Sequence, residues 1–486
     1  MSISKVQMLI NGEWTNSVDG EVIPIENPAK RRSVFAEVPR AKADDVDIAV
    51  QAANKAFSSW RKVPARERGK LLWKIADLID ERREEIARIL ATETGNAIRT
   101  QARGEIQGVA EILRYFGGVA GELRGDTLPV DNNLMTYTQR EPFGVIGGII
   151  PWNAPVQLAT LKIAPAIAAG NTIVLKAAEA APLAVLELAK ACDQVLPPGV
   201  VNVLTGYGEE CGEAIANHPL IKKLTFTGST KVGKSIMRAA SDRIIPVSLE
   251  LGGKSPQIIF PDADEDKVID GVISAMRFAR QGQSCSAGSR MFLHASIFDS
   301  FIEKLITKLK QLKIGDPLSE ESDMGSIINE KQYNGVCSFI KEGMNSDEFE
   351  LLLGGLPPKE GPLSEGYYLV PTIFKCSDMN TRLAREEIFG PVLVVVPWED
   401  EEEVIRLAND SNYGLAAFVW TRDSTKALKV ANQLESGWVQ INRGGAQMPG
   451  LSYGGYKQSG IGREFSLESM INSFTQEKSI MINFDE

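Results

Sequence analysis

Cys285 is the residue of this chain best suited to covalent chemistry. It lies in Gly282-Gln-Ser-Cys-Ser-Ala-Gly288, where small neighbours would let another molecule approach the sulfur closely. A thiolate is a strong nucleophile, but a lone cysteine is more often structural, so both roles stay open on composition alone. The other cysteines lie in ordinary helix or strand surroundings: Cys192, Cys211, Cys337 and Cys376.

Two further polar residues are candidates for chemistry at that sulfur. Glu250 follows an apolar run and precedes two glycines, where a carboxylate could act as a general base or simply cap the strand. Asn153 follows Pro151-Trp152 and could donate its amide to an oxyanion, or could cap the next helix.

Histidine and cysteine usage excludes several kinds of site. The chain has only two histidines, His218 and His294, and five cysteines without a C-x-x-C pair. A histidine-rich metal site is therefore impossible, and a thiolate zinc site or a disulfide framework is not expected. We expect no metal, and we expect any catalytic base to be a carboxylate.

The overall composition narrows the class of protein. The 486 residues include 53 Lys+Arg and 63 Asp+Glu, a net charge of −10, which argues against a nucleic-acid partner. No apolar run reaches the roughly 18 residues of a membrane-spanning helix, and the N-terminus lacks the apolar stretch of a signal peptide. We therefore expect a cytoplasmic protein with no membrane partner.

The candidate residues must be positioned by a regular alternation of elements. Apolar periodicity predicts helices over 46–60 and about 70–91. After Gly144, short apolar runs alternate with helical segments, which is typical of βαβ units and a parallel sheet. The predicted strands are 145–150, 172–175, 200–204, 223–226 and 247–249, and the helices are 156–169, 183–196, 209–217 and 230–241.

Polar or glycine-containing segments follow each of these strands. Ligands of open α/β sheets bind at the carboxyl ends of the strands, so this order of elements predicts a nucleotide-sized site. The G-x-G-x-x-G fingerprint is absent. Gly228-Ser-Thr-Lys-Val-Gly233 opens a helix, where free amides could bind a phosphate or the segment could simply be a tight turn.

A second α/β region is predicted beyond a boundary near Gly252-Gly253. Its strands are expected at 257–260, 291–294, 392–396, 416–420 and 438–441, and its helices at 265–279, 297–312, 400–409 and 424–435.

Seven motifs together resemble the NAD(P)-dependent aldehyde dehydrogenase superfamily, in the family's order and over nearly the whole chain. They are Pro151-Trp-Asn-Ala-Pro155, Lys176-Ala-Ala-Glu179, Phe226-Thr-Gly-Ser-Thr230, Glu250-Leu-Gly-Gly-Lys-Ser-Pro256, Gly282-Gln-Ser-Cys285, Glu386-Glu-Ile-Phe-Gly-Pro-Val392 and Gly454-Gly-Tyr-Lys-Gln-Ser-Gly460.

The resemblance implies the hydrolytic, non-acylating type of reaction. Cys285 would attack the aldehyde, and the side chain of Asn153 with the Cys285 backbone N–H would hold the oxyanion. Hydride transfer to the cofactor would leave a thioester, which water activated by Glu250 would hydrolyse. Lys162 is a further polar candidate near the site.

The same resemblance implies NAD as cofactor, with NADP as a second option. A carboxylate at the adenosine ribose would accept from its hydroxyls and repel a 2′-phosphate, which favours NAD. The implied contacts are Trp152, Gly228 and Ser229 along the pyrophosphate, Lys176 and Glu179 at the adenosine ribose, and Glu387 and Phe389 at the nicotinamide end.

The implied substrate tunnel has small or polar residues where many members have aromatic ones. We expect it to be wide and to suit a bulky, aromatic or branched aldehyde. Arg280 and Arg443 raise the alternative of a semialdehyde whose distal carboxylate they would hold, although ordinary salt bridges would also explain them. The tunnel positions are Gly108, Ala154, Leu161, Ala279 and Gln447, with added space at Gly444-Gly445.

The implied fold is α/β with three parts. A Rossmann-like parallel-sheet cofactor domain would comprise 1–122 and 143–251, a second α/β catalytic domain 252–458, and a small β oligomerisation arm 123–142 and 459–486. The arm implies a homodimer or homotetramer. Two alternatives are enzymes that need no Glu250, a CoA-acylating semialdehyde dehydrogenase and a reductase of activated acids. A third is a catalytically silent protein on this scaffold.

Overall fold

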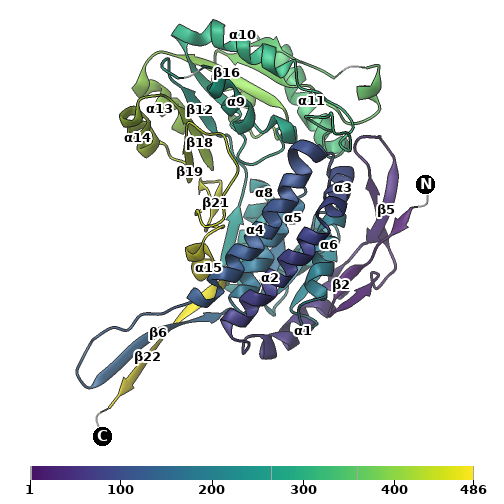
Figure 1. The fold of residues 1–486 in the computed structure, drawn as a ribbon, viewed down its shortest axis with the longest axis vertical. Helices are drawn as coiled ribbons and strands as arrows, with labels where there is room; N and C mark the ends of the chain where they lie inside the picture. The colour runs from purple at the N-terminus through teal and green to yellow at the C-terminus, as the bar shows by residue number, and fades with distance from the viewer. Residues whose placement is uncertain (1–2, 264, 358, 485–486) are drawn as a thin grey trace.

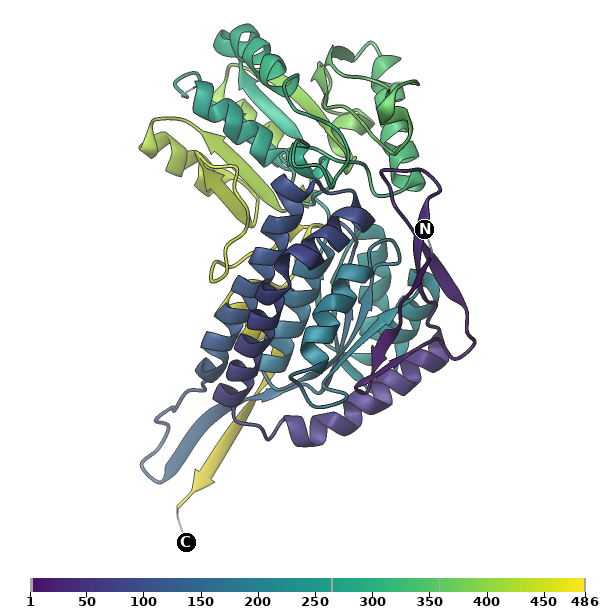
Figure 2. The same ribbon diagram turned by 45° about the vertical axis from the view of Figure 1, so that its right-hand side comes forward.

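Two β-sheets, each covered by helices, form two lobes with a two-stranded arm below them (Figures 1 and 2). The computed structural model describes residues 3–263, 265–357 and 359–484. It confirms the predicted α/β class with two predominantly parallel sheets. Within these residues, no helix is both long and apolar enough to cross a membrane.

The first sheet has the strand order β21-β11-β10-β7-β8-β9-β2-β3. Its five central strands are parallel and nearly all their residues are buried, as expected for a sheet covered on both faces. The strand order reverses between β7 and β10, which opens a crevice at their carboxyl ends. The strands are β7 Val145–Ile149, β8 Thr172–Ala177, β9 Val201–Thr205, β10 Ile221–Thr227 and β11 Val247–Glu250, with antiparallel β2 Met8–Ile10, β3 Glu13–Thr15 and β21 Gly460–Ile461.

Helices cover both faces of this sheet, and two of the predicted helices are each divided in the structure. The segment 70–91 is not a single helix, because the chain leaves helical geometry at Arg82 (φ −110°, ψ 18°) between α2 and α3. Neither glycine nor proline marks this break, and the apolar spacing runs through it. The segment 209–217 also divides, into a π-helical turn at Gly208–Gly212 and α7. The helices are α1 Ala43–Trp60, α2 Ala65–Glu81, α3 Arg83–Thr94, α4 Arg103–Val119, α5 Pro155–Ala168, α6 Leu183–Asp193, α7 Glu213–Asn217 and α8 Thr230–Arg243.

The second sheet has the order β14-β15-β16-β13-β12-β18-β19, and only β14 is antiparallel to its neighbour. All five predicted strands of this region are present, whereas β14, β15 and helix α11 were not predicted. The strands are β12 Pro256–Ile259, β13 Arg290–His294, β14 Phe349–Leu353, β15 Thr372–Cys376, β16 Val392–Trp398, β18 Ala416–Trp420 and β19 Trp438–Ile441. The helices are α9 Glu265–Ala275, α10 Phe298–Leu309, α11 Glu330–Met344, α12 Arg382–Arg385, α13 Glu401–Asn409 and α14 Ser424–Gln433.

The arm consists of β6 (Leu134–Pro142) paired antiparallel with β22 (Thr475–Asn483), and it carries the C-terminus away from both lobes (Figure 1). Before β22, the chain first returns to the first lobe: β21 pairs with β11, and α15 (Leu467–Phe474) packs near α5. The two-stranded part of the arm is thus shorter than 459–486. The domain limits themselves stay a prediction. The remaining strands are β1 Ser4–Lys5, β4 Val22–Glu26, β5 Val34–Pro39, β17 Tyr413–Gly414 and β20 Tyr456–Lys457.

Candidate active site

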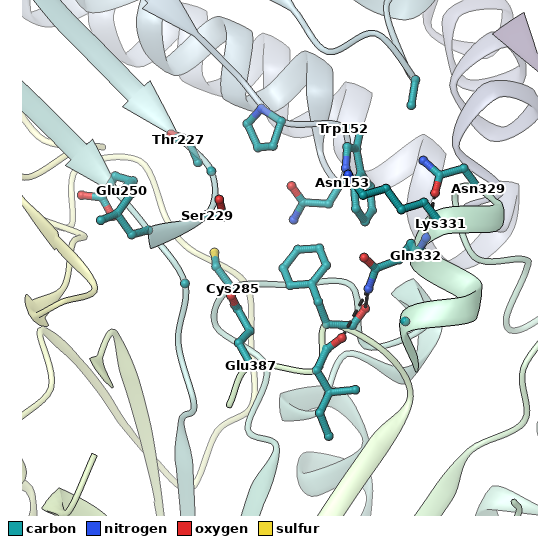
Figure 3. A pocket seen from close by; sticks show the side chains of 18 of the residues that line it. Trp152, Asn153, Thr227, Ser229, Glu250, Cys285, Asn329, Lys331, Gln332 and Glu387 are labelled. Carbon is teal, nitrogen blue, oxygen red and sulfur yellow. Dashed lines mark hydrogen bonds between the residues drawn. The ribbon is translucent and has the colours of Figure 1, made fainter. Parts of the chain in front are cut away.

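A cavity of about 500 Å³ lies where the carboxyl ends of β7, β10 and β11 meet loops of the second lobe (Figure 3). Segments distant in sequence supply its walls, and α11 adds a further wall. Nine of the residues singled out from the sequence line this cavity: Trp152, Asn153, Glu179, Gly228, Ser229, Glu250, Cys285, Glu387 and Phe389.

Cys285 lies on the loop before β13, with its sulfur directed into the cavity (Figure 3). Cys285 is half-buried, whereas the other four cysteines are buried. Gly282 makes the loop possible: its φ is +67°, and a Cβ there would lie 2.1 Å from the carbonyl oxygen of Gly390. The pKa of the Cys285 thiol is raised to about 11, mainly by burial. The nearby carboxylates of Glu387 and Glu250 add to this rise, whereas a hydrogen bond with Tyr453 opposes it.

Asn153 follows β7 and is bound to the nucleophile's loop. Its side-chain Nδ2 donates to the carbonyl oxygen of Gln283 at 3.1 Å, and the residue is 7% exposed. The side chain does not cap α5, whose N-cap residue is Ala154. The first amides of α5 instead donate to the Glu105 carboxylate. Of the two N–H groups of the Asn153 amide, one is therefore left for a ligand.

Glu250 ends β11 as a buried carboxyl group, 5% exposed, and neither of its oxygens has a hydrogen-bond partner within the described residues. Burial and, next, the negative charge of Glu464 raise its pKa well above the usual value. The charges of Lys162 and Arg463 lower it. A perturbed, unpaired carboxyl group in a cavity is typical of a catalytic acid or base.

Lys162 does not line the cavity. It is fully buried on α5 and forms an ion pair with Glu464. Its effect on Glu250 is therefore electrostatic.

Phe389 and Glu387, predicted at the nicotinamide end of the cofactor site, line the cavity together with Trp152, predicted along the pyrophosphate. The rings of Trp152 and Phe389 meet edge to face, with their centroids 5.3 Å apart. Glu387 accepts from the Gly253 amide at 3.1 Å, and burial raises its pKa to about 7. A Cβ on Gly252 would lie 2.1 Å from the Glu387 carboxylate, so glycine is required for this approach.

At the other end, Ser229 and Glu179 reach the cavity from the first sheet. Ser229 is the N-cap of α8, where its Oγ accepts from the Val232 amide at 3.4 Å. Lys176 lies behind the wall, 2% exposed, and its Nζ donates to Glu179 at 3.1 Å. The ammonium therefore positions the carboxylate rather than lining the cavity.

A second cavity, of about 290 Å³, lies between α4 and the 446–449 loop, and two of the predicted tunnel residues, Gly108 and Gln447, line it. Ala154, Leu161 and Ala279 line neither of the two cavities described here.

The two arginines near the predicted tunnel differ in their surroundings. Arg280 is largely buried and is held by Gln101, whose Oε1 accepts at 2.8 Å, and by Glu105 at 3.5 Å. Arg443 is exposed. The contacts of Arg280 agree with the salt-bridge interpretation of this residue.

Sequence reasoning missed two residues beside the reacting groups, Tyr453 and Glu464. Tyr453 Oη lies 3.7 Å from the Cys285 sulfur, and the two residues are 168 positions apart. Glu464 pairs with Lys162 across 302 positions. No local pattern marks either contact.

The chain is similar to known proteins over nearly its whole length. The model of the aldehyde dehydrogenase family matches residues 14–480. Hydroxyisobutyraldehyde dehydrogenase of Mycolicibacterium austroafricanum is 40% identical over 98% of this chain and 94% of its own length. Aldehyde dehydrogenase from Bacillus cereus, solved in complex with NAD+, is 40% identical with a TM-score of 0.95 over 99% of this chain and 97% of its own.

An NADP-dependent enzyme of E. coli also has this fold, with 35% identity and a TM-score of 0.95 over 99% of this chain and 98% of its own. The full-length family match, together with these relatives, shows that the chain belongs to the aldehyde dehydrogenase family.

Proposed function

We propose that the protein oxidises an aldehyde to a carboxylic acid with NAD(P)+, through a thioester on Cys285. The observation that carries this proposal is the convergence of a thiol, a carboxamide and an unpaired carboxyl group on one cavity: Cys285, Asn153 and Glu250. In the CoA-acylating and reductase alternatives, Glu250 would have no catalytic role. A catalytically silent protein with this fold would need none of these three side chains.

The cavity also suits a dinucleotide. Its walls include two carboxylates, Glu179 and Glu387, the aromatic pair of Trp152 and Phe389, and the N-terminus of α8 at Ser229. Helix N-termini favour phosphate, and carboxylates accept from ribose hydroxyls. The bound cofactor supplies the hydride acceptor.

In the first half of the reaction, the Cys285 sulfur bonds to the aldehyde carbon after the thiol proton has left. The C=O electrons move to the oxygen, and the free N–H of the Asn153 amide donates to this oxyanion. The Asn153–Gln283 hydrogen bond holds the amide beside the sulfur, so the donor needs no reorganisation.

In the second half, Glu250 takes a proton from the water that attacks the thioester. The C–S bond breaks, the acid leaves, and Cys285 is regenerated. Its raised pKa makes Glu250 a stronger base than an exposed carboxylate, as general-base catalysis near neutral pH requires.

For the cofactor, Glu179 supports a preference for NAD. Its carboxylate reaches the cavity and is held by Lys176, so a 2′-phosphate would meet a fixed negative charge. The NAD+ complex of the Bacillus cereus relative supports this preference, whereas the NADP-dependent relative keeps NADP as the second candidate.

For the substrate, we favour a bulky or branched uncharged aldehyde over an acid semialdehyde. Glu105 already offsets the charge of Arg280, which weakens the case for a carboxylate site there. Gly108 and Gln447 line a cavity without a cationic side chain among its walls.

We further propose a cytoplasmic homodimer or homotetramer. The arm and the segments next to it carry exposed apolar side chains that a second copy of the chain could cover: Leu128, Val130, Met135, Met481 and Phe484. All five cysteines are free, which suits a reducing compartment.

Formation of NADH with a broad aldehyde panel, with and without CoA, tests the proposal. We expect NADH and free acid without CoA, and no NADH from Cys285→Ala, with NAD binding retained. Strict dependence on CoA would favour the acylating alternative. Activity of Cys285→Ala, or inactivation by alkylation at another cysteine while Cys285 is unmodified, would overturn the assignment of the nucleophile.

A further inference from the structure

The hydroxyl of Tyr453 is the one polar side-chain group recorded in hydrogen-bond contact with the nucleophile's sulfur within the described residues. Its Oη lies 3.7 Å from Sγ of Cys285, within hydrogen-bond range for sulfur. Tyr453 is 5% exposed, so little water competes for this contact. The mechanism proposed above gives this hydroxyl no role.

The tyrosine ring is fixed on two sides and through its backbone. It meets the rings of Trp438 and Phe465 edge to face, with centroids 5.4 Å and 5.7 Å away. Its backbone exchanges two hydrogen bonds with Glu464, at 3.1 Å and 2.8 Å. The hydroxyl is therefore held where it stands, because neither the ring nor the main chain can move away from the sulfur without losing these contacts.

The direction of the hydrogen bond follows from the chemistry of the thiolate. A thiolate sulfur has no hydrogen, so the hydroxyl of Tyr453 must be the donor in this contact. Gln447 lowers the pKa of Tyr453, which makes the hydroxyl a better donor. Burial and the neighbouring Cys285 and Glu250 together raise the pKa of Tyr453 well above its usual value, so the hydroxyl keeps its proton.

We propose that the Tyr453 hydroxyl donates a hydrogen bond to the Cys285 sulfur and thereby stabilises the thiolate from which the reaction starts. This inference deepens the proposed function and rests on it for its catalytic meaning. A donor is needed because burial and the carboxylates Glu387 and Glu250 all oppose formation of the thiolate. Hydrogen bonds to ionised groups are among the stronger ones in proteins.

The proton balance of this step is simple. The Cys285 thiol loses its proton to solvent, and Tyr453 keeps its own throughout. When the C–S bond forms, the sulfur loses its negative charge and the hydrogen bond weakens. The hydroxyl therefore raises the population of thiolate but lowers its intrinsic nucleophilicity.

Titration of the Cys285 thiol in Tyr453→Phe tests the inference without any aldehyde or cofactor. The ultraviolet absorbance of the thiolate is compared between each protein and its Cys285→Ala counterpart. Loss of one hydrogen bond to a charged group should move the midpoint upward by about one pH unit, which corresponds to about tenfold less thiolate below the midpoint. Alkylation of Cys285 by iodoacetamide, located by mass spectrometry, should slow by only about threefold in that range, because the remaining thiolate is more nucleophilic.

Two further variants separate this effect from a structural one. Tyr456→Phe removes a hydroxyl from a largely exposed ring in the same segment and should leave the midpoint unchanged. Gln447 lowers the pKa of Tyr453, so Gln447→Leu should make the hydroxyl a weaker donor and raise the midpoint by less than Tyr453→Phe does. If Tyr453→Phe does not fold, the Gln447→Leu midpoint decides the question alone.

An unchanged or lowered midpoint in Tyr453→Phe would overturn the inference. So would a uniform loss of NADH-burst rate at every pH, which is what a merely structural role predicts. The expected result is a loss of about threefold at low pH that disappears as the pH rises through the midpoint. A shifted midpoint in a protein that oxidises no aldehyde would refute the proposed function and leave the hydrogen bond standing.

Discussion

Asn153 and Gln283 are joined by a hydrogen bond of 3.1 Å that spans 130 positions of sequence. It connects the carboxyl end of β7, in the first lobe, to the loop that carries Cys285, in the second lobe. Both partners are buried, so the bond is shielded from water. One side chain therefore fixes the loop and is the candidate oxyanion donor.

Asn153→Ala should lower kcat by about 10²–10³, the usual effect of removing one preorganised oxyanion donor. Steady-state kinetics with the best aldehyde measures this loss. Asn54→Ala, on the exposed face of α1, is the matched control and should leave kcat unchanged. Near-normal kcat in Asn153→Ala would mean that the amide only secures the loop.

The alkylation rate of Cys285 separates the two roles of Asn153. Loss of an oxyanion donor leaves that rate unaltered, because no oxyanion forms with iodoacetamide. A displaced loop would change it. We expect a rate within about twofold of the wild type in Asn153→Ala, since the loop is also held by Gly282 and by the contact with Tyr453.

Glu250→Gln should slow turnover by about 10²–10⁴, the range expected for loss of a general base, and should still allow one hydride transfer per site. Rapid mixing with NAD and a good aldehyde should give a burst of NADH near one equivalent and then a slow phase. Mass spectrometry should find the acyl group on Cys285. Glu209→Gln, an exposed carboxylate, serves as the control. Loss of the burst itself would assign Glu250 to deprotonation of Cys285.

Glu464→Gln should move the acid limb of the kcat profile to lower pH. The negative charge of Glu464 raises the pKa of Glu250, so removing it lowers that pKa, and the base is then ionised at more acidic pH. Lys162, left without Glu464, strengthens the change because its charge lowers the pKa of Glu250. The pH dependence of kcat measures the limb, under conditions where thioester hydrolysis limits turnover. A limb displaced to higher pH would contradict this electrostatic assignment.

The same substitution should also destabilise the fold by about 3–5 kcal/mol, because it leaves the fully buried ammonium of Lys162 without its partner. Urea unfolding measures this change. Replacing both Glu464 and Lys162 by uncharged residues should recover part of the loss, since no unpaired charge then remains. Equal stability of wild type and Glu464→Gln would show that this ion pair does not stabilise the fold.

The sequence was most informative where local pattern and architecture coincide. The strands β7 to β11 are short, apolar and followed by polar segments, so both the parallel sheet and the edge that bears the cavity could be predicted. The break at Arg82 could not, because α2 and α3 share one apolar spacing and the chain turns there without glycine or proline. Only their packing against other helices shows that α2 and α3 are separate helices.

The candidate site was predictable to the extent that each residue lies within a motif. Cys285 and Asn153 occur in motifs that point to their chemistry, and the structure brings both to one cavity. Tyr453 and Glu464 act through contacts with residues far away in sequence, which no spacing indicates. Lys162 does not line the cavity, and its partner and its full burial emerge only from the fold.

Glu179→Gln should relax the preference for NAD over NADP. The carboxylate reaches the cavity, where it would repel a 2′-phosphate, while Lys176 behind it is already positively charged and donates to it at 3.1 Å. Neutralising Glu179 removes the repulsion and frees the ammonium to attract phosphate. Interactions of this kind between partly exposed charges are typically worth about 1 kcal/mol, so the ratio of kcat/KM for NAD to that for NADP should fall roughly five- to tenfold.

In Glu179→Gln, the affinities for NAD and NADP should change in opposite directions. This difference identifies the charge of Glu179 as the cause of the preference for NAD. NAD should bind more weakly because the glutamine accepts less strongly from the ribose hydroxyls, whereas NADP should bind more tightly. Lys176→Met in the Glu179→Gln background should abolish the gain for NADP, because the attracting charge is then gone. Equal losses for both cofactors would mean that Glu179 only supports the wall of the cavity. A wild-type preference for NADP would mean that Lys176, rather than Glu179, decides the choice at this end of the site.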